Sequence, residues 1–128
     1  MSGVVKILMV DDENDFRQPM VFWFKTKGYD VFEAENGEKA LEIINTNKPD
    51  IVFLDLNMPV MDGFETLKRI RKIDKQLPVI IISAYADPQR IKGMQPYEIS
   101  GVFYKGSDFE EGLSLIESVL RTHKKLKK

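Results

Sequence analysis

Residues 51–63 read IVFLDLNMPVMDG, in which four apolar residues lead directly into an acid, Asp55, and a turn-rich segment follows. The apolar run is too short for a buried helix, and its Ile, Val and Phe content is typical of a strand that is covered on both faces. Two comparable runs, Val4–Val10 and Val79–Ile82, lie on either side of it in the sequence. We therefore expect three central strands in one sheet.

Two weaker apolar runs, Tyr29–Ala34 and Val102–Tyr104, follow Gly28 and Gly101 and would complete a five-stranded sheet. Between the runs, apolar residues recur at helical spacing. These residues are Phe16, Met20, Trp23 and Phe24, then Ala40, Leu41 and Ile44, then Phe64, Leu67 and Ile70, and finally Leu113, Ile116 and Leu120. Alternating strands and helices form right-handed crossovers and a mostly parallel sheet with helices on both faces, so we predict a doubly wound α/β fold.

Prolines and a glycine disturb two of the helical stretches. Pro19 lies within the first stretch, where it removes a backbone donor and is expected to bend the helix. Gly93 and Pro96 interrupt the stretch from 87 to 100. We predict a short or irregular helix there.

The size and composition are those of one globular domain. The chain has 128 residues, of which 43% are hydrophobic and 30% charged, and we expect residues 1–128 to form a single domain without an internal linker. The net charge of -1 gives no sign of a nucleic-acid surface. The basic end, residues 123–128, is expected to be a solvated helix terminus, where cations suit the helix dipole.

The residue types exclude several kinds of site. The absence of Cys excludes disulfides, thiolate metal sites and cysteine nucleophiles, and the single His, His123, excludes a site that needs two imidazoles. Residues 1–3 lack the features of a signal peptide, and no apolar run approaches the roughly 20 residues of a membrane span. We expect a cytoplasmic protein without a membrane association.

Polar residues follow four of the expected strands. They are Asp11 and Asp12 after the first strand, Asp55 after the third, Ser83 after the fourth and Lys105 after the fifth. In an open α/β sheet, ligands bind outside the carboxyl ends of the strands, so these side chains are expected to share one site. A single Asp after a strand often simply caps the next helix or opens a turn. Two further acids, Glu13 and Asp15, follow the first pair, however, and one residue is enough for a cap.

Three carboxylates at one sheet edge repel one another unless a cation lies among them. Mg²⁺ suits such a set, since it prefers oxygen ligands and is commonly held by one or two carboxylates together with phosphate oxygens. The buried run before Asp55 would hold this residue rigidly, and Asn57 is placed to lend a backbone carbonyl to the metal. Asp55 is therefore the candidate nucleophile, and its attack on phosphorus would give an aspartyl phosphate.

Lys105 and Ser83 have roles that fit this chemistry, and each also has a simpler interpretation. A lysine would neutralise the phosphoryl oxygens in the transition state, although Lys105 taken alone is an ordinary surface lysine. Ser83 is a candidate N-cap for the next helix, and its hydroxyl is equally placed to donate to a phosphoryl oxygen, so that both roles can hold in different states. The segment 57–63 is either a plain loop or a support that holds Asp55 and Asn57 against the metal, and the sequence does not decide between the two.

With this set of residues, the chain resembles the response regulator receiver family. The resemblance rests on residues 10–13 (VDDE), on residues 53–63, on Ser83-Ala84 and on Lys105, in order and at family-like spacing over nearly the whole chain. It implies a flavodoxin-like strand order of 2-1-3-4-5. It also implies that Asp12, Asp55 and the Asn57 carbonyl hold Mg²⁺, with Asp11 supporting the metal indirectly.

The resemblance also implies a function and partners. A histidine kinase or phosphotransfer protein would phosphorylate Asp55, and Ser83 and Lys105 would contact the phosphoryl group. The protein would then be a phosphoacceptor signalling domain that catalyses only its own phosphorylation and dephosphorylation. An unknown downstream protein would receive the signal, without direct nucleic-acid contact, and the pattern allows a homodimer. Since no output domain is present, we expect either a protein that acts by binding another protein or a part of a longer chain.

Two positions depart from the family pattern. Receivers usually carry Pro directly after the lysine, often behind a cis bond, and this chain has Gly106 there. They also usually carry an aromatic residue three positions before the lysine, where this chain has Val102, followed by Phe103 and Tyr104. We therefore predict complete phosphate chemistry and altered signal transmission.

Two other functions would use the same residues. A Mg²⁺-dependent phosphatase with an aspartyl-phosphate intermediate normally needs a second Asp where this chain has Asn57, and the chain is also short of a substrate cap. A constitutive interaction module with a degenerate switch is favoured by Val102 and Gly106 and opposed by the intact acidic cluster. Both alternatives stay open, and the phosphatase is the weaker of the two.

Overall fold

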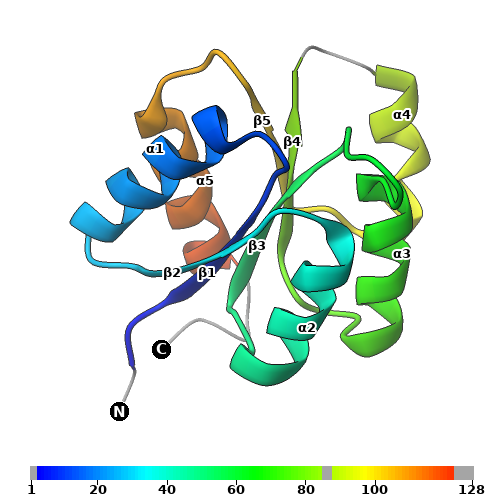
Figure 1. The fold of residues 1–128 in the computed structure, drawn as a ribbon, viewed down its shortest axis with the longest axis horizontal. Coiled ribbons are helices and arrows are strands. Elements are labelled where there is room, and N and C mark those ends of the chain that lie inside the picture. The colour runs from blue at the N-terminus through cyan, green and yellow to red at the C-terminus, as the bar shows by residue number, and fades with distance from the viewer. Residues whose placement is uncertain (1–2, 85–87, 123–128) are drawn as a thin grey trace.

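The architecture is a five-stranded parallel sheet between two layers of helices (Figure 1). The structure is a computed structural model, and it describes residues 3–84 and 88–122. The strands are β1 (Lys6–Val10), β2 (Asp30–Ala34), β3 (Ile51–Asp55), β4 (Val79–Ser83) and β5 (Gly101–Tyr104). Their order is β2-β1-β3-β4-β5, and each neighbouring pair is parallel. The predicted doubly wound α/β fold and its strand order are confirmed.

Helices cover both faces of the sheet. They are α1 (Asn14–Thr26), α2 (Gly37–Asn47), α3 (Gly63–Ile73), α4 (Pro88–Gly93) and α5 (Phe109–Thr122), with a short 3₁₀ turn, η1 (Gln95–Tyr97). α1 and α5 lie on one face, and α2, α3 and α4 lie on the other (Figure 1). The short α4, which ends at Gly93, confirms the irregular helix expected there. α1 continues through Pro19 to Thr26, and the bend at Pro19 stays a prediction.

The sheet separates two apolar cores, because successive residues of a strand point to opposite faces. Ile7 and Met9 of β1 join the core under α1 and α5, whereas Leu8 and Val10 join the core under α2 and α3. All four side chains are fully buried. Burial of each contributes about 1.5–3 kcal/mol to the stability of the fold. This double burial fixes the central strands and, with them, the residues at their carboxyl ends.

An aromatic cluster joins β3 and β5 to α1. The ring centroid of Phe53 lies 5.4 Å from that of Phe24 and 6.5 Å from that of Phe103. Phe103 also lies 6.2 Å from Phe16. The buried aromatic residue of β5 therefore faces α1 and α5, whereas Val102 packs against the opposite core.

Some expectations concern residues outside the described ranges. The basic end at 123–128, including His123, is one of them, so its solvated helix terminus stays a prediction. Residues 85–87, between β4 and α4, also lie outside. Within 3–84 and 88–122, no helix combines the length and the apolar character that crossing a membrane requires.

Candidate functional site

The carboxyl ends of four strands meet at one edge of the sheet. Asp11 directly follows β1, Asp55 ends β3, Ser83 ends β4 and Lys105 directly follows β5. The carboxyl ends of β4 and β5 lie side by side, because the Lys105 N–H donates to the Ser83 carbonyl at 2.8 Å. The structure therefore brings together the polar residues that the sequence placed at this edge.

Three carboxylates converge there. One oxygen from each of Asp11, Asp12 and Asp55 lies within 4.8 Å of the corresponding oxygens of the other two. Asp11 and Asp55 are only 0% and 2% exposed, whereas Asp12 is exposed. The site thus consists of a buried carboxylate pair with a third carboxylate at its mouth.

Local hydrogen bonds occupy one oxygen of each buried carboxylate. The Glu13 N–H donates to Asp11 Oδ1 at 2.8 Å, and the Asn57 N–H donates to Asp55 Oδ1 at 3.2 Å. In both turns, an Asp side chain accepts a hydrogen bond from the backbone two residues further on. The other two oxygens, Asp11 Oδ2 and Asp55 Oδ2, are buried and have no hydrogen-bond partner within the described part of the chain.

Lys105 lies among these acids. Its Nζ is 3.1 Å from Asp11 Oδ2 and 3.7 Å from Asp55 Oδ2, and both are ionic contacts without hydrogen-bond geometry. Nζ also donates a hydrogen bond to Glu13 Oε1 and lies 4.9 Å from the centre of the Phe16 ring. The lysine is therefore held by ionic and cation–π contacts at the point where phosphoryl oxygens would need a cation.

Burial and charge crowding shift the pKa values of these groups. Burial, and then the charge of Asp11, raise the pKa of Asp55 from 3.8 to about 7, against the opposing effects of the Asn57 N–H and Lys105. Burial also raises the pKa of Asp11. Burial lowers the pKa of Lys105, but its interactions with the Glu13 and Asp11 carboxylates outweigh this effect and raise it overall. A cation bound beside Asp55 would favour its ionised, nucleophilic form.

The donor set suits a hard divalent cation. Two buried carboxylate oxygens have an ionic contact with Lys105 but no hydrogen-bond partner in the described residues, and a buried charge is costly unless it is both paired and hydrogen-bonded. Asp11, Asp12 and Asp55 supply oxygen ligands of the kind that Mg²⁺ prefers, and Asn57 lies in the loop that directly follows β3. The residues present therefore fit a Mg²⁺ ion.

The loop from 57 to 63 packs closely against the end of β3. A Cβ atom at Gly63 would lie 2.2 Å from the Asp55 carbonyl oxygen and 2.8 Å from Leu56 Cα, so a larger residue requires the backbone to move. Asp62 caps α3, because its Oδ1 accepts from the Glu65 N–H at 2.9 Å. The segment is thus both a loop into a capped helix and a support for the backbone of Asp55.

Two capping interpretations are wrong. α4 begins at Pro88, so Ser83, buried at the end of β4, is not its N-cap. The N-cap of α1 is Glu13, and its side chain makes no capping hydrogen bond. The acids after β1 are therefore not explained by helix capping.

Three charged residues contact the site without having been predicted from the sequence. Glu13 accepts a hydrogen bond from Lys105, Arg90 Nη1 donates to Asn57 Oδ1 at 2.8 Å, and Arg17 Nη1 donates to the Asp11 carbonyl at 2.6 Å. The sequence does indicate that Arg17 is unusual, because this charged residue shares the buried stripe of α1 with Met20, Val21 and Phe24. The contacts of Glu13 with Lys105 and of Arg90 with Asn57 join residues that are distant in the sequence, and no local sequence pattern predicts them.

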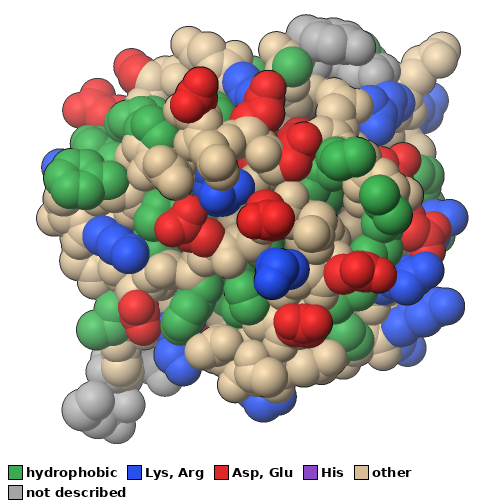
Figure 2. All heavy atoms as spheres, in the orientation of Figure 1, with side chains coloured by type: hydrophobic (Ala, Val, Ile, Leu, Met, Phe, Trp, Pro, Cys, Tyr) green, Lys and Arg blue, Asp and Glu red, His purple; other side chains and the backbone are tan. Residues whose placement is uncertain are grey.

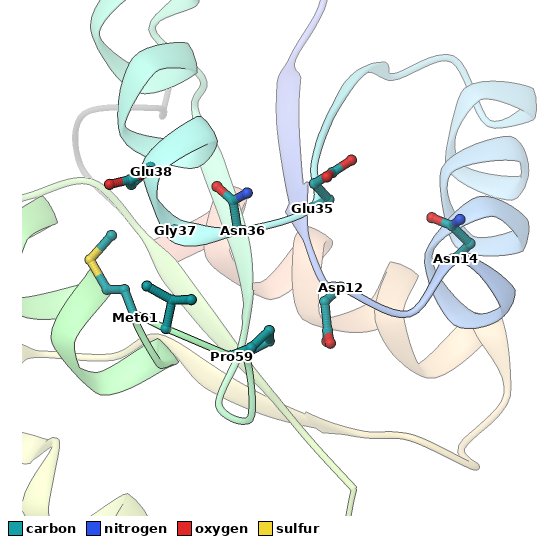
Figure 3. A pocket seen from close by; sticks show the side chains of 9 residues that line it. Asp12, Asn14, Glu35, Asn36, Gly37, Glu38, Pro59 and Met61 are labelled. Atoms are coloured by element: carbon teal, nitrogen blue, oxygen red, sulfur yellow. The ribbon is translucent and has the colours of Figure 1, made fainter.

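A hollow of about 330 Å³ lies beside the acidic cluster (Figure 3). It is lined by Asp12, Asn14, residues 35–38 and residues 59–61. Asp12, Glu35 and Glu38 make its wall acidic, which disfavours an anion there. Figure 2 shows acidic and basic side chains close together near the centre of the face in view. An anionic phosphodonor would be favoured on the side of Lys105 and not in this hollow.

Comparison with known proteins finds relatives over most of the chain. The family model described as the response regulator receiver domain matches residues 7–117. Sporulation initiation phosphotransferase F of Bacillus subtilis is 40% identical over 106 residues, which cover 83% of this chain and 86% of that protein. Regulatory protein AtoC of Escherichia coli is 38% identical over 87 residues, which cover 68% of this chain but only 19% of AtoC. This chain therefore matches a small part of the longer relative.

Solved structures share the architecture. The Vibrio cholerae chemotaxis protein CheY4 superposes with a TM-score of 0.88 at 29% identity, covering 92% of this chain and all of that one (100%). A CheY-like receiver domain protein from Methanospirillum hungatei gives a TM-score of 0.90 over 98% of this chain and 100% of its own, at 21% identity. The second likeness concerns the fold alone.

Proposed function

This chain belongs to the response regulator receiver family, and we propose that it accepts a phosphoryl group onto Asp55 from a histidine kinase or phosphotransfer protein, in a reaction that requires Mg²⁺. Receiver domains belong to two-component systems and are signalling domains, not classical enzymes. The observation that carries the proposal is Asp55 Oδ2, which is buried, lacks a hydrogen-bond partner in the described residues and lies 3.7 Å from Lys105 Nζ. A carboxylate oxygen kept in this state is available as a nucleophile.

Asp55, Lys105 and Ser83 have separate roles in the proposed reaction. An Asp55 carboxylate oxygen forms a bond to phosphorus while the bond from phosphorus to the donor breaks. The donor, an imidazole nitrogen or the acetate of acetyl phosphate, leaves with the bonding electron pair. Lys105 neutralises charge on the phosphoryl oxygens, and the Ser83 hydroxyl donates a hydrogen bond to one of them.

Asp11, Asp12 and Asp55, with the backbone carbonyl of Asn57, would hold the Mg²⁺ ion. When bound, the ion supplies positive charge that draws an anionic phosphodonor toward the acidic site. Among the protein groups, Asp11 and Asp55 supply the two buried oxygens that lack hydrogen-bond partners within the described residues. Asp12 is exposed and supplies a ligand from the mouth of the site.

Phosphorylation would change the binding of a downstream protein. The alternative is a constitutive interaction module, and the structure of β5 gives it some support. Val102 lies where receivers usually carry an aromatic switch residue, and the buried Phe103 faces the other core. This alternative predicts that partner binding is the same whether or not Asp55 carries a phosphoryl group.

Acetyl phosphate and intact mass spectrometry test the proposal. The chain should gain the mass of one phosphoryl group in the presence of Mg²⁺ and none after Mg²⁺ is removed. Asp55→Asn should abolish the gain, whereas Asp30→Asn, the same change at an exposed residue of β2, should leave it intact. Phosphorylation of Asp55→Asn to the wild-type extent would show that the nucleophile is another residue.

A further inference from the structure

Arg17 carries a buried positive charge beside the acidic site. Its side chain is 8% exposed, and burial of a charge is costly unless hydrogen bonds and an opposite charge compensate it. All three kinds of guanidinium nitrogen have a partner. Nε contacts Glu33 Oε1 at 2.9 Å, Nη1 donates to the Asp11 carbonyl at 2.6 Å, and Nη2 donates to Asn14 Oδ1.

One of these three acceptors, the Asp11 carbonyl, belongs to the loop that carries Asp11 and Asp12, and Asn14 is the residue of α1 that directly follows this loop. The main chain of Asp11 is thus held on both sides, because its N–H donates to the Ala34 carbonyl at 3.1 Å and its carbonyl accepts from Arg17. Its Oδ1 is held by the Glu13 N–H. Only Asp11 Oδ2 is left for the site. Arg17 therefore completes the set of contacts that fixes the orientation of the peptide between Asp11 and Asp12.

That peptide also determines where the Asp12 carboxylate can lie. Asp12 is exposed, and within the described residues its side chain makes no hydrogen bond that would hold it. Its placement therefore depends on the main chain. Mg²⁺ requires near-ideal octahedral geometry, and residues that orient the ligands of a metal typically change its affinity about 10–100-fold when they are mutated.

We propose that Arg17 is a positioning residue for phosphorylation, whose guanidinium orients the Asp11–Asp12 peptide so that both carboxylates can hold Mg²⁺. This inference rests on the function proposed above. A lysine in its place keeps the charge but not the planar arrangement of donors that reaches three separate acceptors. The protein should then bind Mg²⁺ more weakly while Asp55, Lys105 and Ser83 keep their places at the carboxyl ends of separate strands.

Arg71 provides a matched control. It is a half-buried arginine of α3 that also spans three acceptors, the carbonyls of Tyr97, Asp74 and Glu98, at 2.7, 3.0 and 3.1 Å. Asp74 follows α3, Tyr97 ends η1 and Glu98 follows η1, and none of the three belongs to the acidic site. Arg71→Lys therefore removes a comparable hydrogen-bond set without touching the Asp11–Asn14 loop.

The test is calorimetric titration of the full chain with MgCl₂, together with the rate of acetyl phosphate labelling as a function of Mg²⁺ concentration. Arg17→Lys should raise the Mg²⁺ dissociation constant about 10-fold and recover most of the wild-type labelling rate at saturating Mg²⁺. Arg71→Lys should lower the melting temperature. It should leave unchanged both the Mg²⁺ dissociation constant from calorimetry and the Mg²⁺ concentration that gives half the maximal labelling rate. Equal Mg²⁺ constants for wild type and Arg17→Lys would overturn the proposal, as would equal weakening by Arg71→Lys.

Two further readouts keep the outcome clear. If Arg17→Lys does not fold, Asn14→Ala removes one acceptor of the guanidinium at an exposed residue, and it should raise the Mg²⁺ constant severalfold. An unchanged constant for Asn14→Ala would then overturn the proposal. The calorimetric arm needs no phosphodonor. A wild-type chain that binds Mg²⁺ but is not labelled would therefore contradict the proposed function without deciding the role of Arg17.

Discussion

Replacement of Asp55 by Asn should stabilise the metal-free protein at alkaline pH. The Asp55 carboxyl is buried beside Asp11, and its pKa rises from 3.8 to about 7 on folding. A carboxyl with a raised folded-state pKa contributes full stability below pH 3.8, and that contribution is lost as the pH rises to about 7. Asp55→Asn removes the titration while keeping the shape of the side chain, so the difference between the two proteins should grow with pH.

The size of the effect follows from the shift. A pKa of about 7 in the folded protein against 3.8 in the unfolded chain corresponds to a gain for Asp55→Asn of roughly 4 kcal/mol at pH 8 and under about 2 kcal/mol at pH 5. These are upper limits, because Asp11 and Lys105 adjust their own charge and position when Asp55 titrates. A gain of about 2 kcal/mol at pH 8 would already be unusual, since most single substitutions destabilise.

Urea unfolding in metal-free buffer at pH 5 and pH 8 measures this difference. Trp23 is a suitable reporter, because its ring packs 5.7 Å from Phe109 and 5.9 Å from Phe24, away from the acids. Asp30→Asn is the control and should change the free energy of unfolding by less than about 0.5 kcal/mol at both pH values. Saturating Mg²⁺ should stabilise wild type more than Asp55→Asn, because a ligand that binds only the folded state stabilises it. A gain that is absent at pH 8, or equal at both pH values, would refute the reasoning.

Other substitutions probe the remaining parts of the site. Asp12→Ala should weaken Mg²⁺ binding in calorimetry without lowering the metal-free melting temperature, since it relieves repulsion at the sheet edge; a strongly lowered melting temperature would make Asp12 a structural residue. Gly63→Ala should lower the melting temperature by several degrees and slow labelling, because its Cβ would lie 2.2 Å from the Asp55 carbonyl; wild-type behaviour in both assays would contradict the close packing. Beryllofluoride with Mg²⁺ should increase amide protection between 84 and 101, and Val102→Tyr should change partner binding more than the labelling rate.

The central strands and the polar sheet edge could be predicted because each produces a recognisable local pattern in the sequence. A strand covered on both faces must be continuously apolar, and the residues that end such strands stand out as polar. The order of the strands came from the family resemblance, since the pattern of apolar residues does not say which strand pairs with which. The ends of the weaker strands were less clear, and β2 begins at Asp30 and β5 at Gly101.

The side-chain contacts around the acids could not be predicted in the same way. The hydrogen bond between Lys105 and Glu13 joins residues 92 positions apart, and that between Arg90 and Asn57 joins residues 33 apart. Such contacts depend on rotamers that only the folded backbone selects. Arg17 differs, because a charge on the apolar stripe of a helix requires a compensating partner inside the protein. Its partners, however, were defined only by the structure.

The side chains of β5 leave little room for an aromatic switch, and this determines how the segment between β4 and β5 should respond to phosphorylation. Phe103 is fully buried between Phe16 and Phe53, so it has no open space into which to rotate. Val102 faces the α3 side but has few rotamers and little reach. Gly106 has a φ of +99° and leaves the backbone after Lys105 without the restraint of a proline. α4 has six residues, and none of them is buried, so activation should act mainly by ordering the stretch from 84 to 101, of which residues 85–87 lie outside the described ranges. Unchanged exchange there, with a sharp change in the environment of Phe103 or Tyr104, would instead indicate an aromatic switch in a shifted register.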